Sequence, residues 1–384
     1  MNDLNLYSYQ HVAPELRVFH GDESLAALRR ELERNGCRRA VVVCGRTMSR
    51  SEALGLLREA LGPWFAGITA AAREHSPVSG VEEAARFLKE AHADAVIAVG
   101  GGSAAVTART AAILLGEQKP LSELCTRRLA DGKFESPRLN APKLPQFVVP
   151  TTPSTAFVKA GSAVHDDSGQ RLALFDPKTR AKALFLHPDF VRTAPLELVR
   201  SASLNAFANA VEALESPKCD PISEAFLMQA LRLIKANLHG LADDGIAARE
   251  RLLVAAILCG RATEQGGAGL ASVLAHAIGR RSHVANGIVN AIVLPHTMRY
   301  NAPATADRGA TIAEALGERP EVPVAAVEAF LGTLATPRAL REIHVDREDL
   351  PAIADAAMSD WFISRNPRRV PDASTVLEIL EAAW

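Results

Sequence analysis

A buried strand that runs directly into three glycines and a serine is the feature that most constrains this chain. Residues 96–103 read VIAVGGGS, and the turn consists of Gly100, Gly101, Gly102 and Ser103. Glycine permits positive φ and close backbone approach, and residues 104–115 are typical of a helix whose N-terminal amides attract an anion. The spacing matches neither GxGxxG nor GxxxxGK[ST]. Two interpretations therefore stay open at this point, a phosphate-binding turn and a purely structural strand-to-helix connection.

The charge balance excludes several classes of partner. The chain has 43 Lys and Arg against 44 Asp and Glu in 384 residues, so it lacks the basic surface that nucleic acids or anionic membranes attract. No apolar run is long enough to span a bilayer, and the first residues do not resemble a secretory signal. We expect a cytoplasmic protein with a small-molecule partner, no nucleic acid and no membrane. The five scattered cysteines predict reduced, inert thiols.

Hydrophobic periodicity divides the chain into two halves. The first half alternates strands and helices, which is typical of an α/β domain with a parallel, Rossmann-like sheet covered by helices on both faces. Ligands of such sheets bind at the carboxyl ends of the strands, where the glycine turn falls. The expected strands are 39–44, 65–69, 95–99 and 146–150, and the expected helices are 25–35, 51–61, 80–91 and 104–115.

After about residue 190 the pattern becomes all-helical. Two apolar patches, 172–175 and 183–186, flank Asp176-Pro177 and predict a β-hairpin or an added strand before this change. We therefore expect an α/β domain over residues 1–192, an all-α domain over 193–384, and a cleft between them. Prolines such as Pro295 and Pro303 are expected to punctuate the helical patterns. The expected helices are 201–214, 222–238, 246–264, 269–279 and 289–299.

Four separated motifs resemble one family. They are the GGGS turn, the VPTT strand end at 149–152, the helix SLNAFANAVEAL at 203–214, and the segment 269–301 that contains NAIVLPH. Their order and spacing resemble the iron-containing alcohol dehydrogenase superfamily, which has a dehydroquinate synthase-like fold. Within it, the LNA triplet and the NPRRV tail at 366–370 are most similar to maleylacetate reductases. The resemblance implies an NAD(P)-binding domain, a helical catalytic domain, hydride transfer between them, and a homodimer.

The resemblance also identifies four positions where the chain departs from the metal-dependent members. Those members hold Fe²⁺ or Zn²⁺ with an Asp and a His four apart on one helix and two later His fourteen apart. Here these positions carry Asn205, Asn209, Ser272 and Asn286. A divalent ion prefers anionic or imidazole ligands, so we predict no catalytic metal. The four side chains are expected either to line the vacated pocket as polar donors or to hydrogen-bond one another.

Reduction without a metal needs a hydrogen-bond donor for the developing oxyanion and a source of a proton. His276 is the predicted proton donor, because the family has a second histidine at this place, four residues after Ser272 on the same helical face. The alternative is a structural histidine in an apolar helix. An acidic substrate would also need cations, for which the candidates are Lys159, Arg280, Arg281 and Arg368.

The cofactor that the resemblance implies is NAD(P)H. After the second expected strand, many NAD-preferring relatives carry an Asp, whereas this chain has Gly45 and Arg46, which predicts that NADP(H) is tolerated or preferred. Alternatively, Arg46 points to water and NAD is used. The resemblance adds the following predicted cofactor neighbours to the glycine turn: Thr107, Thr151, Thr152 and Thr155.

The sequence thus predicts a metal-independent, NAD(P)H-dependent reductase of the maleylacetate reductase type, acting on a small, carboxylated carbonyl or enone substrate. Two alternatives remain. One is a non-redox lyase or isomerase on the same scaffold, and the other is a catalytically silent nucleotide-binding protein.

Overall fold

The computed structural model describes residues 8–129, 134–241, 245–282 and 284–384. Its contacts divide the chain into two compact units. The sheet unit comprises residues 16–203 and 240–260, and the helical unit comprises residues 1–15, 204–239 and 261–384. The units are discontinuous in sequence, whereas the hydrophobic pattern predicts one boundary after residue 192.

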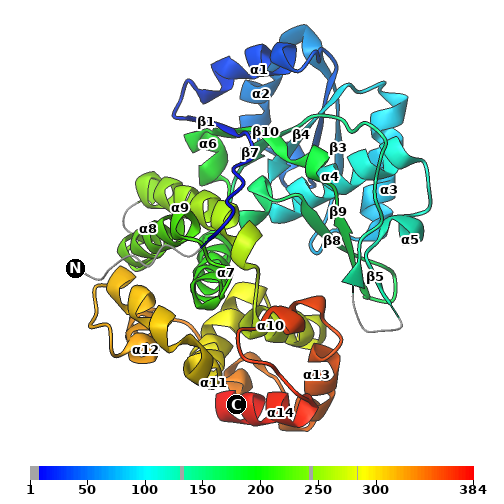
Figure 1. The fold of residues 1–384 in the computed structure, drawn as a ribbon. Helices are drawn as coiled ribbons and strands as arrows, with labels where there is room; N and C mark the ends of the chain where they lie inside the picture. The colour runs from blue at the N-terminus through cyan, green and yellow to red at the C-terminus, as the bar shows by residue number, and fades with distance from the viewer. Residues whose placement is uncertain (1–7, 130–133, 242–244, 283) are drawn as a thin grey trace. The chain divides into compact units, whose positions relative to one another are not determined.

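The sheet unit is built on six strands that pair only in parallel (Figure 1). Their spatial order is β1-β10-β7-β4-β2-β3. The chain moves outward from β2 to β3 and then returns to place β4 on the other side of β2, so the order reverses between β2 and β4. The strands are β1 (Arg17–His20), β2 (Ala40–Gly45), β3 (Phe65–Ala72), β4 (Ala95–Gly100), β7 (Gln146–Pro150) and β10 (Ala181–Leu186).

Helices cover both faces of this sheet because the central strands are apolar on both sides. Val42 and Ile97 pack with α1 and α2 on one face, whereas Val41 and Ala98 pack with α3 and α4 on the other. Continuous burial on both faces is the rule for parallel sheets. The helices of this unit are α1 (Leu28–Arg34), α2 (Ala53–Leu61), α3 (Val78–Glu90), α4 (Gly102–Glu117), α5 (Leu121–Leu124) and α6 (Pro188–Arg192).

The segment after β7 corrects one expectation. Residues 172–175 do not pair with 183–186. Instead β9 (Arg171–Phe175) forms an antiparallel hairpin with β8 (Gly161–His165), and β10 joins the main sheet as the added strand. The sequence pattern also missed β1 and the short ribbon β5 (Arg127–Arg128) with β6 (Phe134–Glu135). Such short strands carry too few residues to show a period.

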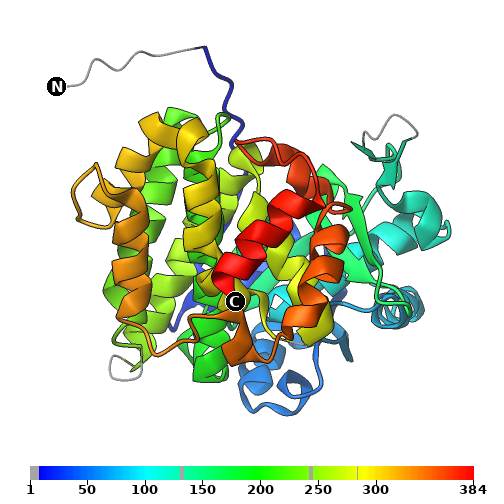
Figure 2. The ribbon, with the colours of Figure 1, turned by 90° about the horizontal axis from the view of Figure 1, so that it is seen from below.

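The helical unit consists of long helices around an apolar core. Figure 2 shows this unit from below, with α14 beside α11 and α13, against which it packs. Two helices, α7 and α9, begin in the sheet unit and end in the helical unit. The helices are α7 (Leu196–Glu215), α8 (Pro221–Leu238), α9 (Gly245–Gly266), α10 (Leu270–Ser282), α11 (Asn286–Ala315), α12 (Pro323–Gly332), α13 (Leu350–Ala357) and α14 (Ala373–Ala383).

Helix α11 is longer than the expected 289–299. Pro295 and Pro303 both lie inside it, which contradicts the expectation that they separate helices. The backbone leaves helical geometry at Thr305, with φ −128° and ψ 15°, so two helical segments meet at a kink. Proline removes an amide donor and bends a helix without always ending it.

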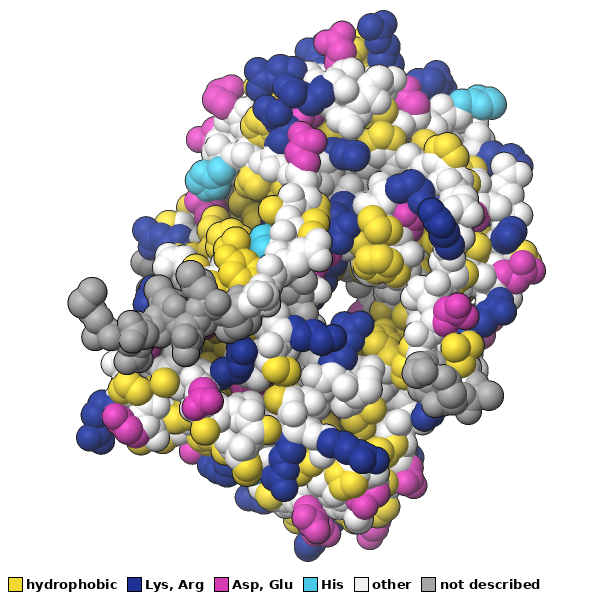
Figure 3. All heavy atoms as spheres, in the orientation of Figure 1, with side chains coloured by type: hydrophobic (Ala, Val, Ile, Leu, Met, Phe, Trp, Pro, Cys, Tyr) yellow, Lys and Arg dark blue, Asp and Glu magenta, His cyan; other side chains and the backbone are white. Residues whose placement is uncertain are grey.

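The α/β sheet and helical region confirm the predicted fold class. All five cysteines are buried, and none of them forms a disulfide within the described residues. In the described residues, no helix is both long and apolar enough to cross a bilayer. On the face drawn in Figure 3, Lys and Arg side chains are interspersed with Asp and Glu.

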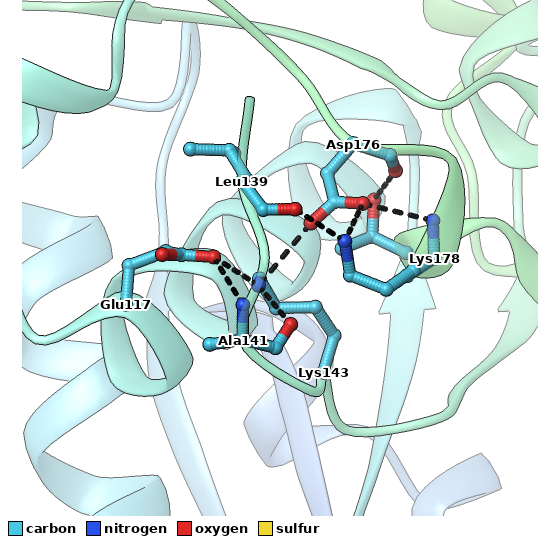
Figure 4. A network of polar contacts seen from close by, with 7 residues as sticks. Glu117, Leu139, Ala141, Lys143, Asp176 and Lys178 are labelled. Carbon is cyan, nitrogen blue, oxygen red and sulfur yellow. Dashed lines mark hydrogen bonds and ion pairs between the residues drawn. The ribbon is translucent and has the colours of Figure 1, made fainter. Parts of the chain in front are cut away.

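A buried ion cluster ties α4 to the loops that follow it in the sheet unit (Figure 4). The side chain of Lys143 is fully buried, and its Nζ lies 2.6 Å from a Glu117 oxygen and 3.2 Å from an Asp176 oxygen. The hydrogen bond from Lys143 lowers the pKa of Glu117. Lys178 also approaches Asp176, at 3.0 Å, but its side chain is 41% exposed.

This difference in burial predicts different costs for removing the two lysines. Lys143→Met leaves the buried carboxylate of Asp176 without its buried cation, which should lower the free energy of unfolding by about 3–5 kcal/mol. Lys178→Met removes a solvent-screened partner of the same carboxylate and should cost about 1 kcal/mol or less. Urea unfolding of both variants measures the difference, and equal losses would contradict the assignment.

Candidate functional sites

The carboxyl ends of three neighbouring strands form the first candidate site. In the sheet, Cys44 pairs with Val99 and Gly100 pairs with Pro150, so the ends of β2, β4 and β7 lie side by side. The amide of Thr151 donates to the carbonyl oxygen of Gly100 at 3.0 Å. This edge contains the point where the strand order reverses, and such points bind ligands in open α/β sheets.

The glycines of the turn are needed for different reasons. Gly100 has φ +139°, a conformation that side-chain-bearing residues rarely adopt. A Cβ on Gly101 would lie 3.0 Å from Thr152 Oγ1, and a Cβ on Gly102 would lie 2.6 Å from Ser154 Oγ. The two strand ends therefore approach so closely that side chains on the turn would displace their neighbours.

Helix α4 begins at Gly102 with no side chain capping its N-terminus. Its first turn contains Ser103, so backbone amides and a hydroxyl lie together at this edge of the sheet. The buried guanidinium of Arg109 donates to the carbonyl oxygens of Ala156 and Gly161 at 2.6 Å each, which fixes the η4 turn (Thr155–Val158) against α4. This end of α4 is suited to an anion.

The other predicted cofactor residues lie at different depths. Thr152 and Thr155 are buried close to the turn, whereas Gly45 ends β2 and Arg46 is exposed directly after it. Thr107 is fully buried on α4, and its hydroxyl has no hydrogen-bond partner among the described residues. Burial places Thr107 in the core beneath the turn rather than on its surface.

The second candidate site lies in the helical unit, where α7 carries two of the four predicted positions. Asn209 Nδ2 donates to the backbone oxygen of Asn205 at 2.6 Å. Asn205 Oδ1 in turn accepts from Asn290 Nδ2 of α11 at 3.0 Å. Asn290 is almost fully buried and was not predicted, because an asparagine in an apolar helix gives no distinctive signal.

Ser272, the third position, is held by a carboxylate. Glu212 of α7 accepts from the Ser272 amide at 3.0 Å and from its hydroxyl at 2.5 Å. Burial raises the pKa of Glu212 above its usual value. The hydrogen bonds that Glu212 accepts around the start of α10 act in the opposite direction but do not outweigh burial. Asn286, the fourth position, begins α11, and its side-chain oxygen lies against Gly279 of α10.

A second buried carboxyl lies one turn further along α7. Burial raises the pKa of Glu215 to about 8, and its hydrogen bond with Asn301 opposes this shift. Asn301 Nδ2 donates to Glu215 at 2.9 Å, and Asn366 Nδ2 donates to Asn301 Oδ1 at 2.7 Å. Asn366 Oδ1 also accepts from the amide of Leu270, the first residue of α10.

His276, the predicted proton donor, lies one turn beyond Ser272 on α10. Its Nδ1 lies 2.9 Å from Asp360 Oδ2. Asp360 caps the short helical turn η8 (Trp361–Arg365) by accepting from the Phe362 amide at 2.9 Å. The side chains of His276 and Asp360 are 20% and 11% exposed, so the pair is partly reachable by solvent.

The predicted cations have different surroundings. Arg281 forms an ion pair with Asp349 at 3.4 Å, and Arg368 donates to the carbonyl oxygen of Tyr300 and stacks on its ring. Arg280 is exposed at the end of α10, and Lys159 follows η4 in the sheet unit. Arg281 and Arg368 are thus both engaged by neighbours within the helical unit.

Sequence reasoning missed Glu212 and Asp360, which hold Ser272 and His276. Glu212 lies one turn after Asn209, and Asp360 precedes an aromatic pair, but neither spacing indicates a partner on another helix. In the described part of the chain, no group of three or more His, Cys, Asp or Glu side chains is arranged to hold a metal ion.

Two family models match this chain, one in each half of the sequence. Residues 14–188 match the family described as iron-containing alcohol dehydrogenase, and residues 200–384 match the C-terminal part of the Fe-containing alcohol dehydrogenase family. The chain is 30% identical over 376 residues to maleylacetate reductase 1 of Cupriavidus pinatubonensis, covering 97% of this chain and 96% of the relative. It is 27% identical to the NAD-dependent methanol dehydrogenase of Bacillus methanolicus over 316 residues, covering 79% and 80%.

A solved structure of a maleylacetate reductase has the same fold as this chain. The maleylacetate reductase of Rhizobium sp. strain MTP-10005 superposes with a TM-score of 0.80 at 25% identity, covering 99% of both chains. The matches span both units and all the motifs that carry the resemblance. The chain therefore belongs to the iron-containing alcohol dehydrogenase family, a family of oxidoreductases.

Proposed function

We propose that this protein is an NAD(P)H-dependent reductase of small, carboxylated carbonyl or enone substrates, of the maleylacetate reductase type, that works without a catalytic metal. The observation that carries the proposal is the His276–Asp360 pair, an imidazole oriented by a carboxylate one helical turn from Ser272. Such a pair can supply a proton to a developing oxyanion. The similarity to maleylacetate reductase 1 supports the substrate class.

The edge of the sheet fits a dinucleotide. The turn approaches Thr152 and Ser154 so closely that it has no room for a Cβ, so it presents backbone rather than side chains at this edge, and the uncapped amides of α4 are suited to a pyrophosphate. The residues that would hold it are those of the glycine turn with Thr151 and Thr152. When bound, the reduced nicotinamide supplies a hydride. The exposed Arg46, with no carboxylate at its position, supports the use of NADPH.

The remaining chemistry belongs to the chain's own residues. With Nδ1 directed at Asp360, Nε2 is the ring nitrogen that we assign to proton donation to the substrate oxygen. Asp360 stabilises the charged imidazole before the proton leaves. The amides of Asn209 and Asn286 are suited to hydrogen-bond a polar substrate.

The four positions that the resemblance assigns to metal ligands carry side chains that do not fit a metal ion. They offer three neutral amides and one hydroxyl, whereas divalent ions prefer anionic or imidazole ligands. The hydroxyl of Ser272 is donated to Glu212, and the side-chain oxygen of Asn205 is occupied by Asn290. This use of the polar atoms supports chemistry that involves no metal at these positions.

The proposal is tested by following the absorbance of NADPH and NADH with maleylacetate and a panel of 2-oxo and enone acids. We expect oxidation of the cofactor with at least one acid, at a rate that a chelator leaves unchanged. Cofactor binding without oxidation across the panel would indicate a silent or non-redox protein. One tightly bound iron or zinc per chain that activity requires would contradict the metal-free mechanism.

The turn can be tested by Gly102→Ala. The added methyl group would meet Ser154 Oγ, which caps the η4 turn, and would therefore disturb the strand ends that we propose hold the pyrophosphate. We expect the Kd for NADPH to rise about tenfold or more, as measured by fluorescence titration, since one lost charge-assisted hydrogen bond has this magnitude. Gly55→Ala in α2 is the matched control, because its Cβ meets nothing within 4 Å. An unchanged Kd for Gly102→Ala would show that the pyrophosphate does not bind at this turn.

The proton donor can be tested by His276→Ala, which should lower kcat about 10²-fold or more. His239→Ala, at an exposed position after α8, is the control and should retain full activity. Asp360→Asn should lower kcat less and move the limb of the pH–rate profile that reports the proton donor to lower pH, because an amide no longer stabilises the imidazolium. A His276→Ala rate within a few-fold of the native rate would make this histidine structural.

A further inference from the structure

The chain places a cation beside the His276–Asp360 pair that the sequence did not single out. Arg365 ends the η8 turn, and its guanidinium carbon lies 5.2 Å from the ring centroid of Phe362. The same ring lies 6.0 Å from the ring of His276. The guanidinium and the imidazole therefore both neighbour the same aromatic ring.

The stem of Arg365 is packed as well as stacked. Its Cδ and Nη1 lie 3.3 Å from the place where a Cβ on Gly267 would be, and Gly267 has φ +79°. Only glycine combines this backbone conformation with such a close approach. The arginine is thus held between the end of α9 and Phe362.

The charge of Arg365 is not neutralised by a salt bridge within the described residues. Among those residues, Arg365 stacks on Phe362 and is attracted at longer range by Asp360. The two carboxylate oxygens of Asp360 already bind His276 and the Phe362 amide. The protein atoms around the guanidinium lower the pKa of Arg365, yet an arginine stays protonated. Arg281 and Arg368, by contrast, are engaged with Asp349 and Tyr300.

We propose that Arg365 anchors a carboxylate of the substrate, with the group to be reduced directed at His276 across the Phe362 ring. This inference rests on the proposed reductase function and names the residue that recognises the acid. A guanidinium binds a carboxylate through two parallel hydrogen bonds, and Arg365 is exposed, so its donors can be reached by a ligand. The aromatic ring that both groups neighbour covers the apolar carbons of a short chain.

The substitution Arg365→Met tests this anchor, because methionine keeps an unbranched stem for Phe362 and Gly267 while removing the charge. With an oxo acid that the native enzyme reduces, we expect KM to rise about 10- to 100-fold, the range for a lost charge-assisted bond. With the methyl ester of the same acid, the substitution should change KM less than about threefold. Arg365→Lys should recover part of the loss.

Arg319→Met is the matched control, because it removes an exposed arginine of the helical unit that has no place in the proposed site. It should leave KM for the acid unchanged. The melting temperature of each variant is compared with that of the native protein, and Arg365→Lys and Arg365→Gln replace the methionine variant if it does not fold.

A binding measurement separates this inference from the reductase function. Calorimetry with glutarate, a saturated dicarboxylate with no group to reduce, should show binding to the native protein and at least tenfold weaker binding to Arg365→Met, while uncharged glutaramide binds neither. If Arg365→Met loses glutarate binding and the native protein has no reductase activity, Arg365 is a carboxylate anchor but the protein is not a reductase. Native reductase activity with unchanged glutarate affinity and KM in Arg365→Met would reject the anchor, as would the absence of glutarate binding to the native protein.

Discussion

The carboxylate of Glu212 at the start of α10 is the interaction on which the helical site depends. Helix termini leave amides without intrahelical partners, and a buried terminus needs an acceptor from elsewhere in the chain. Glu212 supplies it from α7, and its hydrogen bonds to Ser272 fix the rotation of α10. That rotation decides which face of α10 carries His276 toward Asp360. The same helix pairing brings the asparagines of α7 beside Asn290 of α11.

The loop between α13 and α14 completes this arrangement from the opposite end of the chain. Asn366 accepts from the first amide of α10, and Asp360 holds the histidine farther along the same helix. A short segment therefore contacts α10 at two places, and between them it carries Phe362 and Arg365. Rigid support of this kind keeps a reactive group in one rotamer, which is what proton transfer requires.

The candidate site of the sheet unit depends on strand register rather than on side-chain contacts between helices. Parallel pairing in continuous register aligns the ends of β2, β4 and β7, so a turn after one strand meets the residues after the next. Alternation of strand and helix predicted this arrangement correctly, because each strand is long and apolar enough to show its period. It did not predict β1, whose four residues pair with a strand distant in sequence, or the β8–β9 hairpin, whose two strands are short.

The sequence alone determined the fold class, the glycine turn and the chemistry of the donors at Asn205, Asn209, Ser272 and Asn286, because period, backbone freedom and functional group are local properties. Only the tertiary structure decided the partners of those groups. Glu212 and Ser272 are 60 residues apart, and His276 and Asp360 are 84 apart. No spacing rule covers such separations, since the meeting of two side chains depends on how whole helices pack. For the same reason Arg365 became distinguishable from the other arginines only once Phe362 and Gly267 were in place around it.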